Sequence, residues 1–260
     1  MPTLLILLIG VSFAKHFYEQ EPIRSASGVF SEDKALSWGL SKRGEGLPPD
    51  PDPGAPEILE KYGDLYIGDT KENIIYLTFD QGYENGYTPK ILDVLRLNDV
   101  KCVFFITGHY LKENLPLVKR MIKEGHEVGN HGMMHKSLPT LSEEDIKKEV
   151  NDLNDAFYSE FGENMRFLRP PKGEYSLKTL RVTNELGYTN VFWSFAYQDW
   201  LADKPKGEEY AFNEVTKYFH NGEIILLHAV SADNAYALDR IIKSAREKGY
   251  EFGELGALTK

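Results

Sequence analysis

Short apolar runs recur along the chain from residue 74 onward, and each has about the length of a β-strand. Between them lie amphipathic segments whose apolar residues repeat at helical spacing. Strands that alternate with helices along a chain form a parallel sheet. The pattern therefore predicts an α/β fold of about seven parallel strands, near residues 74–79, 102–106, 126–130, 166–169, 190–195, 223–228 and 249–252.

The helical segments carry signals for their starts and for their buried faces. Thr88-Pro89 is typical of a helix start, with Thr88 as the N-cap residue. Ser142 followed by Asp145 indicates a capping box at the start of another helix. The apolar residues of that helix share one face and are assigned to the core: Ile146, Val150, Leu153, Phe157 and Phe161.

The number of strand and helix units favours a distorted, incomplete (β/α) barrel over an open doubly wound sheet. No Gly-x-Gly-x-x-Gly sequence follows the first predicted strand, as a dinucleotide-binding sheet would require. Barrel enzymes carry their active sites at the carboxyl ends of the strands. We expect the polar residues at or just beyond these ends to meet there: Asp80, His131, Arg169, Asp199 and His228.

The first 64 residues differ from the rest. Residues 1–14 contain no charged side chain and hold an apolar run of about ten residues, which is typical of a signal peptide. An uncleaved membrane anchor and a buried terminal strand are the alternatives. Residues 15–64 are mostly polar and hold many Pro and Gly residues between 46 and 56, so we predict an extended arm that Trp38 pins to the core. Residues 65–260 then form the catalytic domain.

Composition limits the function of the chain. The 260 residues are 42% hydrophobic, which is enough for one substantial core. The formal net charge of -10 argues against binding to the phosphates of nucleic acid. Cys102 is the single cysteine and cannot form an intramolecular disulfide, so we assign it a buried structural role.

His131 and His135 are candidate metal ligands. They follow a Gly-Asn pair and are four residues apart, so that both imidazoles can reach one ion. Such a pair arises easily by chance among seven histidines. The prediction therefore depends on the acid at the end of the first strand, Asp80, which by itself could be a turn or helix-capping residue.

Two further pairs are candidates for catalysis. Arg169 lies in an Arg-Pro-Pro sequence that limits the local backbone and suits a bidentate grip on Asp80. Asp199 and His228 come from separate strands, and they are either an ordinary buried pair or a proton donor with the acid that orients it. Their shared place at the strand ends favours the second interpretation.

Five short sequences occur in one order along the chain: Thr78-Phe79-Asp80-Gln81, His131-Gly132-Met133-Met134-His135, Arg169-Pro170-Pro171-Lys172-Gly173, Asp199-Trp200 and Leu226-Leu227-His228. In this order they resemble the motifs of the NodB-homology polysaccharide deacetylases, carbohydrate esterase family four. The resemblance covers about residues 36–258. Residues 66–72 and 83–90 are especially similar to the subgroup that deacetylates muramic acid during spore-cortex formation. The resemblance implies the distorted barrel of that family.

The resemblance also implies an activity. It indicates a hydrolase that removes the acetyl group from N-acetylmuramic acid in peptidoglycan, after which the product closes to muramic δ-lactam. Asp80, oriented by Arg169, is then the base that takes the proton of water. His228, held protonated by Asp199, gives the leaving amine its proton. A divalent metal ion, expected to be zinc, is held by His131, His135 and Gln81.

Gln81 departs from the pattern of the wider family, which has a second acid at this position. An amide oxygen can still coordinate a metal ion, but the lost negative charge predicts weaker metal binding. The muramic subgroup likewise has an amide residue here, so the change does not by itself imply inactivity.

The expected partner is the peptidoglycan glycan strand. Because an acidic protein needs a local cation to hold an anionic sugar, Lys172 is the candidate for its lactyl carboxylate, with Gly173 and Trp200 beside it in the substrate site. We expect export to the cell wall or forespore envelope, with no membrane insertion after cleavage, and predict no particular oligomeric state. The alternatives are a deacetylase of N-acetylglucosamine polymers or acetyl xylan, and a sugar-binding protein whose catalysis has lapsed through Gln81.

Overall fold

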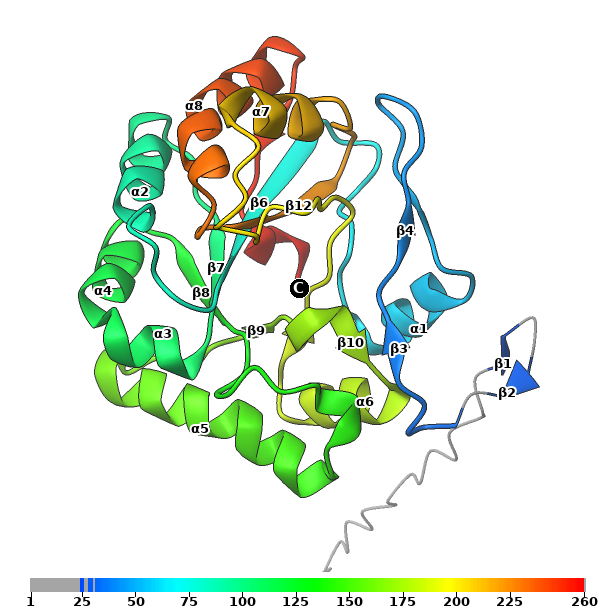
Figure 1. Ribbon diagram of the computed structural model, residues 1–260. Coiled ribbons are helices and arrows are strands. Elements are labelled where there is room, and N and C mark those ends of the chain that lie inside the picture. Colours follow the sequence, from blue (N-terminus) through cyan, green and yellow to red (C-terminus); the bar gives the residue numbers. More distant parts are fainter. Residues whose placement is uncertain (1–23, 26–27, 30, 260) are drawn as a thin grey trace, which may run out of the picture.

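A sheet of seven strands forms the centre of the protein (Figure 1). The computed structural model describes residues 24–25, 28–29 and 31–259, so the predicted signal peptide lies outside the described residues. The strands are all parallel, in the order β11-β9-β8-β7-β6-β12, with β13 paired to the start of β6. Their bounds are β6 (Ile74–Gln81), β7 (Val103–Ile106), β8 (Glu127–Asn130), β9 (Phe167–Leu168), β11 (Thr189–Asn190), β12 (Glu223–His228) and β13 (Glu251–Phe252). The predicted α/β class is confirmed.

The sheet curls toward closure as a distorted barrel. Isolated bridges join its two ends: Phe195 with Ile225, Leu65 with Val191, and Ile67 with Glu223. A continuous strand over residues 190–195 was the wrong prediction, because β11 is only 2 residues long. The carbonyls of Val191 and Phe192 instead accept hydrogen bonds from the buried guanidinium of Arg169. The interruption of this strand is therefore linked to a charged group inside the barrel.

Helices pack around the outside of the strands (Figure 1). They are α2 (Thr88–Leu97), α3 (Gly108–Glu113), α4 (Leu115–Lys123), α5 (Glu143–Phe161), α6 (Leu177–Glu185), α7 (Glu208–Thr216) and α8 (Ala232–Glu247), with short 3₁₀ turns η1 (Leu138–Thr140), η2 (Pro171–Gly173) and η3 (Leu255–Leu258). No helix in the described part of the chain is long and apolar enough to span a membrane.

The helix starts follow the sequence signals with one exception. Ser142 caps α5 as predicted, and its side chain accepts a hydrogen bond from the backbone N–H of Asp145. The reciprocal half of the predicted capping box does not form, because the Asp145 carboxylate accepts from the Ser142 hydroxyl instead. The N-cap of α2 is Tyr87, so the N-cap role predicted for Thr88 was wrong. Thr88 lies inside the first turn, and its hydroxyl donates to the carboxylate of Glu84.

Successive residues of β6 point to opposite faces of the sheet. Ile75, Leu77 and Phe79 pack in the main core, which includes buried residues of the surrounding helices. Tyr76 belongs instead to a smaller cluster inside the barrel. The same alternation places Asp80 on the inner face. The strand therefore delivers a carboxylate to the interior at its carboxyl end.

From residue 36 onward, the segment ahead of the barrel packs onto it. β3 (Leu36–Ser37) pairs with β10 (Glu174–Tyr175), β4 (Leu40–Ser41) pairs with β5 (Asp50–Pro51), and β1 (Arg24–Ser25) pairs with β2 (Gly28–Val29). The prediction of an extended arm was wrong for α1 (Ala55–Tyr62), where Pro56 lies in the first turn and its missing N–H costs no hydrogen bond. Trp38 is buried in a core cluster with residues of α1 and α6, which agrees with its predicted contact to the core.

Candidate active site

The carboxyl ends of the strands open into a cavity of about 1090 Å³. Seven of the ten predicted site residues line it: Asp80, His131, His135, Lys172, Gly173, Trp200 and His228. Arg169 and Asp199 lie behind this wall, and each contacts a residue that lines it. Gln81 is not among the lining residues. The structure thus brings nine of the ten residues to one place.

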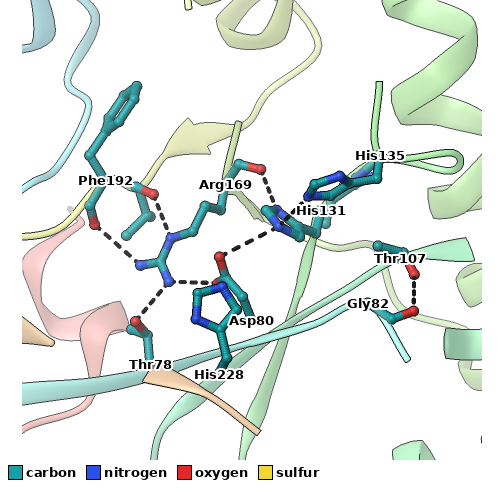
Figure 2. Close-up of polar contacts among 12 residues, drawn as sticks. Thr78, Asp80, Gly82, Thr107, His131, His135, Arg169, Phe192 and His228 are labelled. Atoms are coloured by element: carbon teal, nitrogen blue, oxygen red, sulfur yellow. Dashed lines mark hydrogen bonds and ion pairs between the residues drawn. The ribbon is translucent and has the colours of Figure 1, made fainter. Parts of the chain in front are cut away.

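A buried ion pair lies at the base of the cavity. Arg169 is 0% exposed, and its Nη1 donates to Asp80 Oδ1 at 2.8 Å and to Thr78 Oγ1 at 2.8 Å (Figure 2). Its Nε and Nη2 donate to the carbonyls of Val191 and Phe192 at 3.0 and 3.2 Å. The predicted bidentate grip on the carboxylate was therefore wrong. One hydrogen bond reaches Asp80, and the other donors satisfy groups that would otherwise be buried without partners.

The environment of Asp80 favours its ionised form. Burial is the largest influence on the pKa of this carboxyl and raises it, but the charge and hydrogen bond of Arg169, together with the nearby His131 and His228, outweigh burial and hold the pKa below its usual range. Asp80 Oδ2 lies 3.5 Å from His131 Nε2. The carboxylate therefore has one oxygen fixed by Arg169 and the other near the imidazole.

The two histidines bring their Nε2 atoms close together. His131 Nδ1 lies 2.8 Å from the carbonyl oxygen of Arg169, so this nitrogen carries the proton and Nε2 is free to bind a metal ion. The Nε2 atoms of His131 and His135 are 3.2 Å apart (Figure 2). Two nitrogens on one tetrahedral zinc ion at about 2.05 Å are separated by about 3.3 Å. The pair therefore fits a single ion.

Both imidazoles are held in the neutral form that binds metal. Burial lowers the pKa of His131 and lowers that of His135 to about 4, where the neighbouring His131 adds to the effect. The described residues hold no group of three or more His, Cys, Asp and Glu side chains arranged around one ion. The two imidazoles alone would therefore be a partial ligand set, and their role as metal ligands stays a prediction.

Gln81 lies on the other side of β6 from this set. Its neighbour Asp80 points into the barrel, and successive residues of a strand point to opposite faces. Gln81 is 0% exposed, and its Oε1 lies 3.4 Å from the hydroxyl of Thr88 in α2. The structure does not bring it to the histidines, and its role as a metal ligand stays a prediction.

His228 and Asp199 form the second charged pair. His228 Nδ1 lies 2.7 Å from Asp199 Oδ1, and the backbone N–H of His228 donates to Asp199 Oδ2 at 2.8 Å. Burial lowers the pKa of His228, but the charge and hydrogen bond of Asp199 outweigh it and raise the pKa above the usual value. His228 is paired in register with Asp80 on neighbouring parallel strands. An imidazole with a raised pKa and a carboxylate with a lowered pKa therefore lie side by side.

Glu149 holds the loop that carries His135, and sequence reasoning missed it. Its buried Oε1 accepts hydrogen bonds from the backbone N–H groups of Met134 at 2.6 Å and Lys136 at 3.3 Å. His135 between them has a left-handed φ of 55°. A signal was present, because Glu149 is three residues beyond Ile146 on the apolar face of α5, where a charged residue needs a partner.

Two further polar residues near the site were not singled out from the sequence. Thr78, two residues before Asp80, shares its face of β6 and donates to the carbonyl of Ile225 at 2.6 Å while accepting from Arg169. His109 lines the cavity just beyond the end of β7. The rule that polar residues at strand ends meet on one face would have identified His109. The alternation of β6, which places Thr78 on the face of Asp80, would have identified Thr78.

Comparisons with known proteins agree with this geometry. A family model described as polysaccharide deacetylase matches residues 67–191. The peptidoglycan-N-acetylmuramic acid deacetylase PdaA of Bacillus subtilis is 44% identical over 227 residues, which is 87% of this chain and 86% of that protein. Its solved structure, described as a family 4 carbohydrate esterase, has a TM-score of 0.84 over 87% of this chain and 97% of that chain. A peptidoglycan-N-acetylglucosamine deacetylase of Bacillus cereus is 34% identical, over 73% of this chain and 89% of that protein.

The contact between Asp199 and His228 predicts how the pH dependence of kcat/KM changes in Asp199→Asn. Asp199→Asn removes the negative charge that raises the pKa of His228, so His228 should lose its proton at lower pH. We expect the alkaline limb of kcat/KM for acetate release to move down by about one to three pH units. Asp203 is an exposed acid in the same loop, so Asp203→Asn is the control for the loss of one negative charge. An unmoved limb in Asp199→Asn would show that His228 is not the titrating acid.

The Glu149 contacts predict a change in metal affinity. Glu149→Ala leaves two backbone N–H groups of the His135 loop without their acceptor, so zinc affinity should fall by about ten- to a hundredfold. Glu149→Gln keeps one oxygen acceptor and should stay within a few-fold of the parent protein. Calorimetric titration with zinc, after circular dichroism has shown that each protein is folded, measures this. Equal affinity in folded Glu149→Ala would contradict the positioning role.

Proposed function

The chain belongs to the polysaccharide deacetylases of carbohydrate esterase family 4, and we propose from this premise that it hydrolyses the N-acetyl group of N-acetylmuramic acid in peptidoglycan strands. One observation carries the proposal. A carboxylate with a lowered pKa and an imidazole with a raised pKa lie side by side at one cavity, next to a metal-binding imidazole pair. Groups whose pKa values are driven apart in this way are the mark of a paired base and acid.

Hydrolysis of an amide needs an activated water, a stabilised oxyanion and a protonated leaving group. Asp80 accepts the proton of water through the oxygen that Arg169 leaves free. His228 donates its proton to the sugar nitrogen as the C–N bond breaks, so that acetate leaves and the sugar keeps a free amine. A divalent ion bound by His131 and His135, for which we propose zinc, would polarise the acetyl carbonyl and lower the pKa of water.

The cavity wall carries one lysine that can pair with an anionic sugar. Among the described residues that line it, Lys172 is the single Lys or Arg side chain, and it is exposed. N-acetylmuramic acid differs from N-acetylglucosamine by a lactyl group that ends in a carboxylate. We therefore place that carboxylate at Lys172, where opposite charges attract, with Gly173 and Trp200 on the same cavity wall.

This chemistry places the reaction between two others. The lactyl carboxyl is free only after a hydrolase has removed the stem peptide, so such a reaction must come first. The amine released by deacetylation then lies near that carboxyl, and loss of water between them gives the muramic δ-lactam. The substrate is part of the cell wall, so the protein acts outside the cytoplasmic membrane, at the wall or the forespore envelope.

Acetate release from defined glycans tests the proposal. We expect the protein to release acetate from peptidoglycan stripped of its stem peptides, and to release much less from N-acetylglucosamine oligomers or acetyl xylan. Lys172→Met should lower kcat/KM on the stripped peptidoglycan by about tenfold, the effect of one charge pair near a protein surface. Lys123→Met on α4, an exposed lysine outside the cavity, is the matched control. Faster release from N-acetylglucosamine oligomers would contradict the proposed substrate.

A further inference from the structure

Lys172 enters the cavity from an unusual backbone. Its φ is 62° and its ψ is 7°, a left-handed conformation that side chains other than glycine rarely adopt. The residues on either side of it, Pro171 and Gly173, are buried. A strained residue of this kind persists only where the surrounding structure holds it. Neighbouring segments must therefore hold the turn over residues 171–173.

One side of this turn rests against the metal-binding loop. A Cβ built on Gly132, next to His131, would lie 3.4 Å from a side-chain carbon of Pro171, which is ordinary contact distance. The other side rests against Trp193, because a Cβ built on Gly173 would lie 2.7 Å from its ring. The turn is thus confined between two parts of the cavity wall.

The third support comes from outside the barrel. We call residues 36–38 the N-terminal strap: it consists of β3 and Trp38. β3 pairs with β10, which directly follows the turn. The backbone N–H of Trp38 donates to the carbonyl of Gly173 at 2.9 Å. Its indole Nε1 donates to the carbonyl of Trp193 at 2.9 Å. A single residue of the strap therefore ties together the turn and the wall against which it packs.

Trp38 is itself firmly fixed. It is 7% exposed, and its ring centroid lies 5.1 Å from those of Tyr66 and Phe192. The carbonyl of Phe192 accepts a hydrogen bond from the buried Arg169. The strap is thus connected to the rigid interior of the barrel on one side and to the cavity wall on the other.

We propose that the N-terminal strap, through Trp38, is a positioning element that directs Lys172 toward the carboxylate of an anionic sugar. The inference rests on the proposed function for the identity of that sugar. Selectivity for the anionic glycan then depends on a segment that precedes the barrel in sequence. A structural role alone would make Trp38 important for stability and leave the preference between charged and uncharged sugars unchanged.

Binding affinity for two matched glycans tests the strap. The first is peptidoglycan glycan with free lactyl carboxyls, and the second is the same glycan after methyl esterification, which removes the charge and changes little else. Trp38→Phe keeps an aromatic ring in the cluster but removes the indole N–H. We expect Trp38→Phe to weaken binding of the free-acid glycan by about fivefold or more, which approaches the loss of one charge pair. Binding of the esterified glycan should stay within about twofold of the parent protein.

A double-mutant cycle separates positioning from general damage. In a Lys172→Met background the Trp38→Phe substitution should have no further effect on binding of the free-acid glycan, because the cation that Trp38 positions is already gone. Leu59→Ala, in the same core cluster on α1, is the control that lowers stability without touching the turn. It should lower the melting temperature and leave the preference for the free-acid glycan intact.

The outcomes are distinct. Equal weakening for both glycans, or effects of Trp38→Phe and Lys172→Met that multiply, would overturn the positioning role. Loss of the preference in Leu59→Ala would also overturn it, since instability alone would then be sufficient. Because the readout is affinity, a protein that binds with the expected pattern but releases no acetate would contradict the proposed function and leave the strap supported.

Discussion

The buried ion pair between Arg169 and Asp80 is the interaction on which the rest of the site depends. A guanidinium inside a barrel is costly unless each donor has a partner and its charge is balanced. Asp80 balances the charge, Thr78 shares the same nitrogen, and two main-chain carbonyls accept the remaining bonds. Those carbonyls belong to Val191 and Phe192, where β11 would otherwise have continued. The barrel is distorted at the point where it accommodates this buried charge.

The protonation states in the cavity have separate local causes. Arg169 favours the carboxylate of Asp80, and its carbonyl fixes the tautomer of His131. Asp199 favours the protonated form of His228, while burial keeps His131 and His135 neutral. The proposed base, acid and metal ligands can thus coexist within one cavity because each has a different local partner.

Much of this arrangement could be predicted from the sequence. The strands from residue 74 onward are short apolar runs, and Asp80, His131 and His228 come at their ends, so their meeting follows from parallel topology alone. The family resemblance supplied the roles that topology could not. The helix over residues 55–62 was missed because its first turn holds a proline, which reads as a breaker but is harmless there.

Side-chain direction and long-range partners were harder to predict. Gln81 was expected at the metal because the wider family has an acid there, whereas the alternation of β6 turns its side chain toward Thr88. The single hydrogen bond from Arg169 to Asp80 depends on carbonyls from a distant segment, which no local pattern reveals. The roles of Glu149 and Trp38 likewise arise from contacts between segments far apart in sequence.

The most direct test of this account is the rate of acetate release by Asp80→Asn with zinc present in saturating amounts. The amide keeps an oxygen for the hydrogen bond from Arg169 but cannot take the proton of water. The account predicts that the folded protein retains its zinc affinity while turnover falls by about a hundred- to ten-thousandfold. A folded Asp80→Asn protein that releases acetate at close to the parent rate would contradict it, because the base would then have to be another group.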